Sequence, residues 1–122
     1  MTINNLEAFV GQLWDWAILD GCFGETRIRP SDVDGIVERN GSFLFLEAKG
    51  PDVGISAGQI RTFRALAVRG DTVIILWGNP GQPEYMMVLS PDGTTPRIPC
   101  NLADVRSLVA DWYESTDKGG LR

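Results

Sequence analysis

Two unbroken apolar runs separated by a capped helix constrain this chain more than any other feature. The runs Phe43-Leu-Phe-Leu and Thr72-Val-Ile-Ile-Leu-Trp have the length and composition of strands buried on both faces. Between them, Ser56 suits the N-cap of a helix from about Ala57 to Arg69, and Gly70 suits the position after its end. This order predicts a right-handed crossover that joins two parallel strands.

A β-hairpin is expected directly before the helix. Asn40-Gly41 is a strong two-residue turn signal. It separates a strand over about Val33 to Arg39 from a returning strand over Ser42 to Ala48. The second strand of the hairpin is therefore also the first strand of the parallel pair.

The remaining elements follow from weaker patterns. An apolar stripe at helical spacing predicts a helix from about Asn5 to Asp20, with Asn4 as its N-cap. Further expected elements are strands at Glu25–Arg29, Glu84–Leu89 and Thr95–Ile98, a helix at Leu102–Glu114, and a frayed tail at Ser115–Arg122. Together they predict an α/β fold with a mixed central sheet flanked by helices. The length of 122 residues predicts a single domain, 1–122.

Composition excludes several classes of function. The chain has no histidine, which removes a histidine general base, a catalytic triad and the common zinc sites. No apolar run approaches the ~20 residues of a membrane span, and no basic cluster near the start indicates a secretory signal. Cys22 and Cys100 are expected as free thiols in a reducing compartment, which favours the cytoplasm of a bacterial or phage-infected cell.

The distribution of charge qualifies a net charge of −5. Taken alone, that value argues against a surface that binds phosphates. However, residues 25–70 hold seven basic and six acidic side chains, whereas both flanking segments are net acidic. The middle of the chain is therefore the favoured place for an anionic substrate.

Three charged residues in that middle segment point to chemistry. Glu47 and Lys49 are two positions apart on one strand, so their side chains face the same way. Asp34 lies near the start of the partner strand, so its carboxylate can converge with that of Glu47. Mg²⁺ prefers oxygen ligands and usually takes one or two carboxylates, and the carbonyl of Ala48 would add a third oxygen. Lys49 would then orient the attacking water or stabilise charge on the phosphate.

The arrangement resembles the motif of the PD-(D/E)XK nuclease superfamily. The matching residues are Ser31-Asp32-Val33-Asp34-Gly35 and Leu46-Glu47-Ala48-Lys49, with Gln59 in the following helix. The likeness is nearest to the small virus-type replication-repair (VRR-NUC) nucleases and the Holliday-junction resolvases. It implies a restriction-endonuclease-like αβββαβ core over about residues 5–77. The strand pair and the helix expected over 78–115 lie outside the resemblance. By resemblance, Asp34 and Glu47 bind Mg²⁺ or Mn²⁺, Lys49 is catalytic and Gln59 assists.

Several residues have a second interpretation. The leading proline of the motif does not adjoin the aspartate, since Pro30 stands four residues before Asp34, and either Asp32 or Asp34 is the ligand. Asp32 also suits a turn. Gln59 completes a capping box with Ser56, and Glu7 does so with Asn4 or else adds an acid to the site. Glu47 and Lys49 also suit a plain surface ion pair. Arg61 is either a solvated helix residue or a contact to nucleic acid.

The favoured hypothesis is a divalent-metal-dependent DNA nuclease whose cleavage is structure-directed or non-specific. The alternative is a catalytically silent module of the same fold that binds DNA or a partner protein in a phage or mobile element. A domain with no site is the third hypothesis. The acidic balance predicts weak, salt-sensitive DNA binding, or help from a partner protein or a second copy of the chain.

Overall fold

The computed structural model describes residues 14–119, and the chain divides into two compact units, Met1–Ser31 and Asp32–Arg122. In the described part of the first unit, a 3-10 helix, η2 (Trp16–Leu19), begins at Asp15, whose carboxylate accepts a hydrogen bond from Ala17 N at 2.9 Å. The predicted helix Asn5–Asp20 is therefore wrong at its C-terminal end, because Asp15 starts a separate turn. The rest of that helix, with Asn4 and Glu7, lies outside the described residues.

No strand forms at the predicted position 25–29 in the described chain, where a turn and a bend at residues 25 and 26 are followed by irregular backbone. The Thr26 hydroxyl donates to Phe23 O at 2.7 Å and accepts from Ile28 N at 3.2 Å. These bonds within the segment give its backbone an alternative to pairing with a neighbouring strand.

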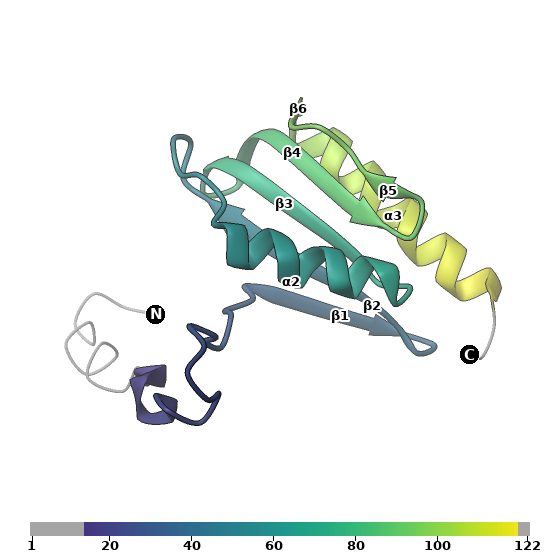
Figure 1. Ribbon diagram of the computed structural model, residues 1–122. Coiled ribbons are helices and arrows are strands. Elements are labelled where there is room, and N and C mark those ends of the chain that lie inside the picture. The colour runs from purple at the N-terminus through teal and green to yellow at the C-terminus, as the bar shows by residue number, and fades with distance from the viewer. Residues whose placement is uncertain (1–13, 120–122) are drawn as a thin grey trace, which may run out of the picture. The chain divides into compact units, whose positions relative to one another are not determined.

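The second unit is built on a six-stranded mixed sheet, which confirms the α/β class (Figure 1). Its strands are β1 (Gly35–Arg39), β2 (Ser42–Lys49), β3 (Thr72–Asn79), β4 (Gln82–Ser90), β5 (Gly93–Thr94) and β6 (Ile98–Pro99). The order is β1-β2-β3-β4-β5, and β6 pairs with another stretch of β4. The pair β2–β3 is parallel, as the predicted crossover requires. The other pairs are antiparallel.

The hairpin between β1 and β2 has the predicted turn. Asn40 and Gly41 both have positive φ, 53° and 84°, which is the requirement of a type I′ turn. The register pairs Arg39 with Ser42 and Gly35 with Leu46. This register brings the start of β1 beside the end of β2.

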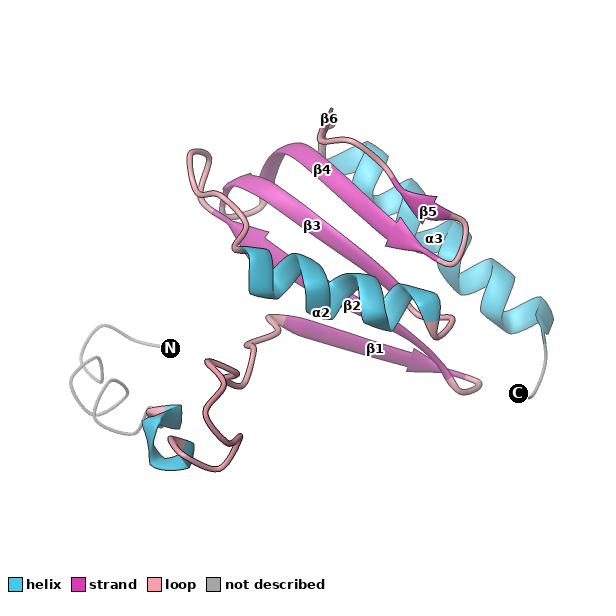
Figure 2. Cartoon of the chain, viewed as in Figure 1, coloured by secondary structure: helices cyan, strands magenta, loops and turns pink. Residues whose placement is uncertain are grey.

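Two helices lie on opposite faces of the sheet (Figure 2). On one side, α2 (Ala57–Val68) covers a core formed by Phe63, Ala67, Val73, Ile75, Trp77 and Leu89. On the other side lies α3 (Leu102–Gly119), where Leu44, Ile74 and Val105 are buried. The predicted bounds of α2 and its N-cap, Ser56, are confirmed to within one residue.

The C-terminal helix is longer than predicted, and the expected fraying from Ser115 is wrong as far as Gly119. Thr116 is buried, and its carbonyl accepts a hydrogen bond from Asn40 Nδ2 at 3.2 Å. Arg39 forms an ion pair with Asp117 and stacks on the Tyr113 ring, 5.3 Å from its centroid. Contacts with the β1–β2 hairpin therefore hold the last helical turns.

The predicted strand at 95–98 is replaced by two short strands, β5, which ends before it, and β6, which overlaps it at Ile98. Thr95 bonds to Val88 of β4 twice, since its backbone N–H donates to Val88 O at 2.9 Å and its hydroxyl oxygen accepts from Val88 N at 2.9 Å. The same hydroxyl donates to the carbonyl of the next residue, Pro96, at 2.9 Å. Pro96 has no N–H to offer to a ladder. Pairing with β4 is therefore interrupted between β5 and β6.

Within residues 14–119, no helix is both long and apolar enough to cross a membrane. Both cysteines are free thiols, as predicted.

Candidate functional site

Glu47 is the buried acid of the candidate site. It lies near the end of β2, paired with Ile75 of β3, and only 6% of the residue is exposed. A carboxylate is rarely buried to this extent unless it has partners. Its neighbours on the α2 side of the sheet therefore define the site.

A hydrogen-bonded chain joins Glu47, Gln59 and Lys49. Gln59 Nε2 donates to Glu47 Oε2 at 3.1 Å, and Lys49 Nζ donates to Gln59 Oε1 at 2.9 Å. Lys49 Nζ also lies 3.4 Å from Glu47 Oε2, and both side chains are 8% exposed. This is a buried three-residue network and not an exposed ion pair on an edge strand.

Gln59 serves the helix and the site with different atoms. Its backbone N–H donates to the Ser56 hydroxyl at 3.1 Å, which is the N-cap bond of α2. Its side-chain amide does not complete a capping box but bridges Lys49 and Glu47. The N-cap half of the predicted capping box is therefore confirmed, whereas an assisting role of Gln59 in catalysis stays a prediction.

Asp34 approaches the site from the start of β1. It stands one residue before the pair Gly35–Leu46, which places it opposite Glu47. Its Oδ2 accepts a hydrogen bond from Ala48 N at 2.8 Å. That bond ties the carboxylate to the end of β2, because Glu47 and Ala48 are consecutive.

The surroundings of Glu47 disfavour the charged form of its carboxyl group. Burial raises the pKa of the Glu47 carboxyl, the nearby Asp34 carboxylate raises it further, and Lys49 opposes both. Glu47 Oε1 is buried and has no hydrogen-bond partner among the described residues. An unpaired buried acceptor costs on the order of 1–3 kcal/mol, and more when it is charged. A cation that contacts this oxygen would remove that cost.

The donor set fits a hard divalent cation. Between residues 14 and 119, no three His, Cys, Asp or Glu side chains gather into a metal-ligand group. Two carboxylates, those of Asp34 and Glu47, with the backbone carbonyl of Ala48, are the oxygens on hand. This is the kind of set that Mg²⁺ accepts while it keeps several waters.

The other predicted residues are not part of this network. Asp32 is exposed and makes none of the described contacts of the network. Arg61 is exposed on α2, and two helical positions turn a side chain by about 200°, which directs it away from Gln59. Its contact with nucleic acid stays a prediction. Ala48 contributes through its backbone, because its side chain faces the side of the sheet opposite to Glu47.

Sequence reasoning missed a second cluster beside this one. Arg97 is stacked over two rings, with its guanidinium carbon 4.3 Å from the Trp77 ring centroid and 4.8 Å from that of Tyr85. It also donates to Pro51 O at 3.1 Å, while Trp77 Nε1 donates to Val53 O at 2.7 Å. These bonds fix the loop between β2 and α2. No pattern in the sequence pairs Arg97 with residues so far away.

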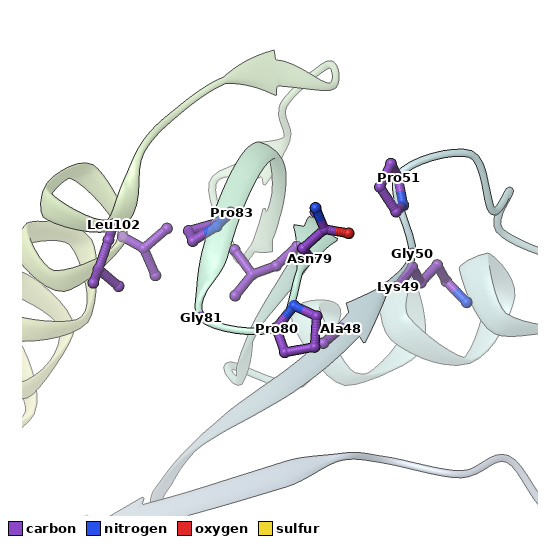
Figure 3. A pocket seen from close by; sticks show the side chains of 12 residues that line it. Ala48, Lys49, Gly50, Pro51, Asn79, Pro80, Gly81, Pro83 and Leu102 are labelled. Atoms are coloured by element: carbon purple, nitrogen blue, oxygen red, sulfur yellow. The ribbon is translucent and has the colours of Figure 1, made fainter.

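An apolar cavity of about 480 Å³ opens on the opposite face of the sheet (Figure 3). Its walls include Ala48, Leu76 and Pro83 of the sheet, Pro80 of the β3–β4 turn, and Leu102 of α3. The ammonium end of Lys49 points away from Pro80 and Leu102. Lys49 is among the residues that line the cavity, whereas Asp34, Glu47 and Gln59 are not, so the cavity adjoins the charged network at Lys49.

Comparisons of the chain with protein-family models, with curated proteins and with solved structures gave no match.

Proposed function

We propose that this chain is a divalent-metal-dependent DNA nuclease of the PD-(D/E)XK type, with the sheet and α2 forming a restriction-endonuclease-like core. One observation carries the proposal. The buried Glu47 carboxylate has one oxygen without a hydrogen-bond partner within residues 14–119, and it lies beside Asp34, in a network with Lys49 and Gln59. A structural ion pair would satisfy both oxygens, whereas a cation site leaves one available.

In this proposal Asp34 and Glu47, with the carbonyl of Ala48, hold Mg²⁺ or Mn²⁺. The ion would supply a water that loses its proton near neutral pH and would draw negative charge from the phosphate oxygens. The chain's own contribution is orientation. Gln59 holds the Lys49 ammonium beside the Glu47 carboxylate, so a fixed positive charge faces the place where a phosphate would bind.

The roles of the two cations differ. Lys49 stabilises charge that develops on the phosphate during attack, and it is worth most in a site that excludes water. The metal pairs with the two carboxylates, whose charges would otherwise repel both each other and the substrate. The proposed reaction is hydrolysis of a phosphodiester bond, in DNA selected by its structure or without sequence preference.

Cleavage assays with linear, nicked, branched and single-stranded DNA test the proposal. We expect cleavage with Mg²⁺ or Mn²⁺, none with EDTA, and a loss of at least about 100-fold in Lys49→Ala. Arg106→Ala is the matched control, because Arg106 is an exposed basic residue of α3, the helix on the other face of the sheet.

Two results would contradict the proposal. One is a folded wild-type protein that is inert on every DNA with both metals. The other is cleavage that Lys49→Ala and Glu47→Ala leave unchanged. Binding of DNA or of a partner protein without cleavage, unaffected by Glu47→Ala, would favour the silent module instead.

A further inference from the structure

A second positive charge lies on the same face of the sheet as Lys49. The register aligns Lys49 with Trp77 of β3, and Trp77 with Tyr85 of β4. Directly paired residues place their side chains on one face, so these three form a row across the sheet. Arg97 lies over the second and third members of the row.

The distance between the two charges follows from the strand spacing. Neighbouring strands are about 4.8 Å apart, so Arg97 lies roughly 5 to 10 Å across the sheet from the position of Lys49. Phosphates recur about every 3.4 Å of helix axis along each DNA strand. If one phosphate of a DNA strand lies at Lys49, another phosphate of the same strand, a few nucleotides away at most, would therefore lie close to Arg97.

Arg97 is held in a fixed orientation. Its guanidinium carbon lies over the rings of both Trp77 and Tyr85, and one of its five N–H groups donates to Pro51 O. The residue as a whole is exposed, which leaves other donors open to solvent. A side chain that is already ordered loses little entropy when it binds an anion, and a guanidinium matches the geometry of phosphate oxygens.

We propose that Arg97 binds a backbone phosphate of DNA next to the one at the Asp34–Glu47–Lys49 site. The proposal rests on the proposed function, since it takes the same substrate as that site. The bond to Pro51 gives Arg97 a second task, which is to hold the loop that joins β2 to α2. Its stacking partner Tyr85 is 38% exposed, so this part of the face is open to a ligand.

The test is the salt dependence of DNA binding. Fluorescence anisotropy with labelled single-stranded and duplex oligonucleotides is measured over a range of salt, with Ca²⁺ as the metal and intact DNA checked on a gel. Arg97→Gln should weaken binding several-fold and lower the slope of log Kd against log salt by about 0.7 for single strands or about 0.9 for duplex. Arg97→Lys keeps the charge and should keep the slope.

Arg106→Gln is the matched control, because it removes the same charge from the helix on the opposite face and should leave the slope unchanged. If Arg97 only held the loop, Arg97→Gln would slow cleavage or lower the melting temperature while the slope stayed at the wild-type value. That result overturns the proposal about Arg97 and leaves the nuclease intact. A wild type that neither binds nor cuts DNA overturns both.

Discussion

A single side chain, Gln59, joins two of the three charged residues of the candidate site, Lys49 and Glu47. Its amide oxygen accepts from Lys49 and its amide nitrogen donates to Glu47. An amide is suited to this position because it offers both a donor and an acceptor without adding charge. The orientation of the Lys49 ammonium therefore depends on a neutral neighbour.

Gln59→Ala should lower kcat for DNA cleavage by about 10- to 100-fold with a smaller change in KM, since residues that orient a site commonly carry effects of this size. Ser56→Ala is the control. It removes the N-cap bond, at a cost of about 1 kcal/mol in helix stability, and leaves the amide bridge in place. Steady-state kinetics that showed equal losses in both variants would place the role of Gln59 in the helix alone.

Glu47 makes a different prediction, about stability without metal. Its pKa is raised in the folded chain by burial and by Asp34, so the folded state binds its proton more tightly than the unfolded state does. The contribution to stability is therefore complete below the ordinary pKa of 4.5 and is lost as pH rises through the raised value. Glu47→Gln should escape this loss and gain up to about 1 kcal/mol at neutral pH in EDTA.

Thermal unfolding of both proteins in EDTA across pH measures this difference. The gap between Glu47→Gln and wild type should widen toward neutral pH, and Mg²⁺ should raise the melting temperature of the wild type only. A gap that stays constant with pH would show that Glu47 titrates as an ordinary carboxylate.

At the scale of elements, glycine matters most where β3 turns into β4. Gly78 follows a register shift after Trp77, and its φ is 153°. A Cβ at this position would lie 2.3 Å from Gln82 O and 3.0 Å from Pro83 Cα, both of them backbone atoms. The close approach of β3 to the start of β4 therefore requires a residue without a side chain at position 78.

Gly78→Ala should destabilise the fold by about 1–3 kcal/mol, since the backbone must shift to admit a methyl group. Gly58→Ala should do the opposite and stabilise by up to about 1 kcal/mol, because Gly58 lies inside α2 and its Cβ would meet only Ser56 Oγ at 4.0 Å. Chemical denaturation of the two variants measures both signs. If the two variants changed the free energy of unfolding equally, the backbone around Gly78 would have to shift at no cost to admit the methyl group.

The elements that could be predicted from sequence are those with local signals. Asn40-Gly41 specifies its turn, and the run at Thr72–Trp77 specifies a central strand because few other structures suit it. The wrong predictions concern elements whose bounds are set by contacts with residues far away in the sequence. The last turns of α3 depend on contacts with Asn40 and Arg39, more than 70 positions away. The sequence around Thr116 contains no signal that predicts these contacts.

The site shows the same division. Glu47 and Lys49 share a face by strand alternation alone, and Asp34 reaches them by hairpin register. Two other features could not be predicted from the sequence, because they depend on atomic positions to within fractions of an ångström. They are the hydrogen bond from Ala48 N to Asp34 and the Glu47 oxygen that has no hydrogen-bond partner among the described residues. Arg97 was missed entirely, since cation–π stacking across strands leaves no pattern in the sequence.

For the whole molecule, charge sets the expected strength of DNA binding. The chain is net −5, yet Lys49 and Arg97 place positive charge on one face of the sheet. Few phosphates would therefore be neutralised, and the rest of the protein would repel the backbone.

Wild-type binding to duplex DNA should show a log–log salt slope of roughly 2, corresponding to about two phosphate contacts at about 0.9 each. Anisotropy titrations with Ca²⁺ present measure it. A slope several times steeper would reveal an extended basic surface, whether from further residues of this chain or from a second copy of it.

All four residues of the candidate site fall within one short stretch of chain, from Asp34 to Gln59. The contacts that join them span 10, 12 and 14 positions. Closing loops of this length costs little entropy, and each doubling adds only about 0.6 kcal/mol. The side chains of the proposed site are therefore all carried by one continuous segment of the chain. Exchange of this one segment between related sheets would carry every side chain of the proposed site, while Arg97, 46 positions from Pro51, would have to be acquired separately.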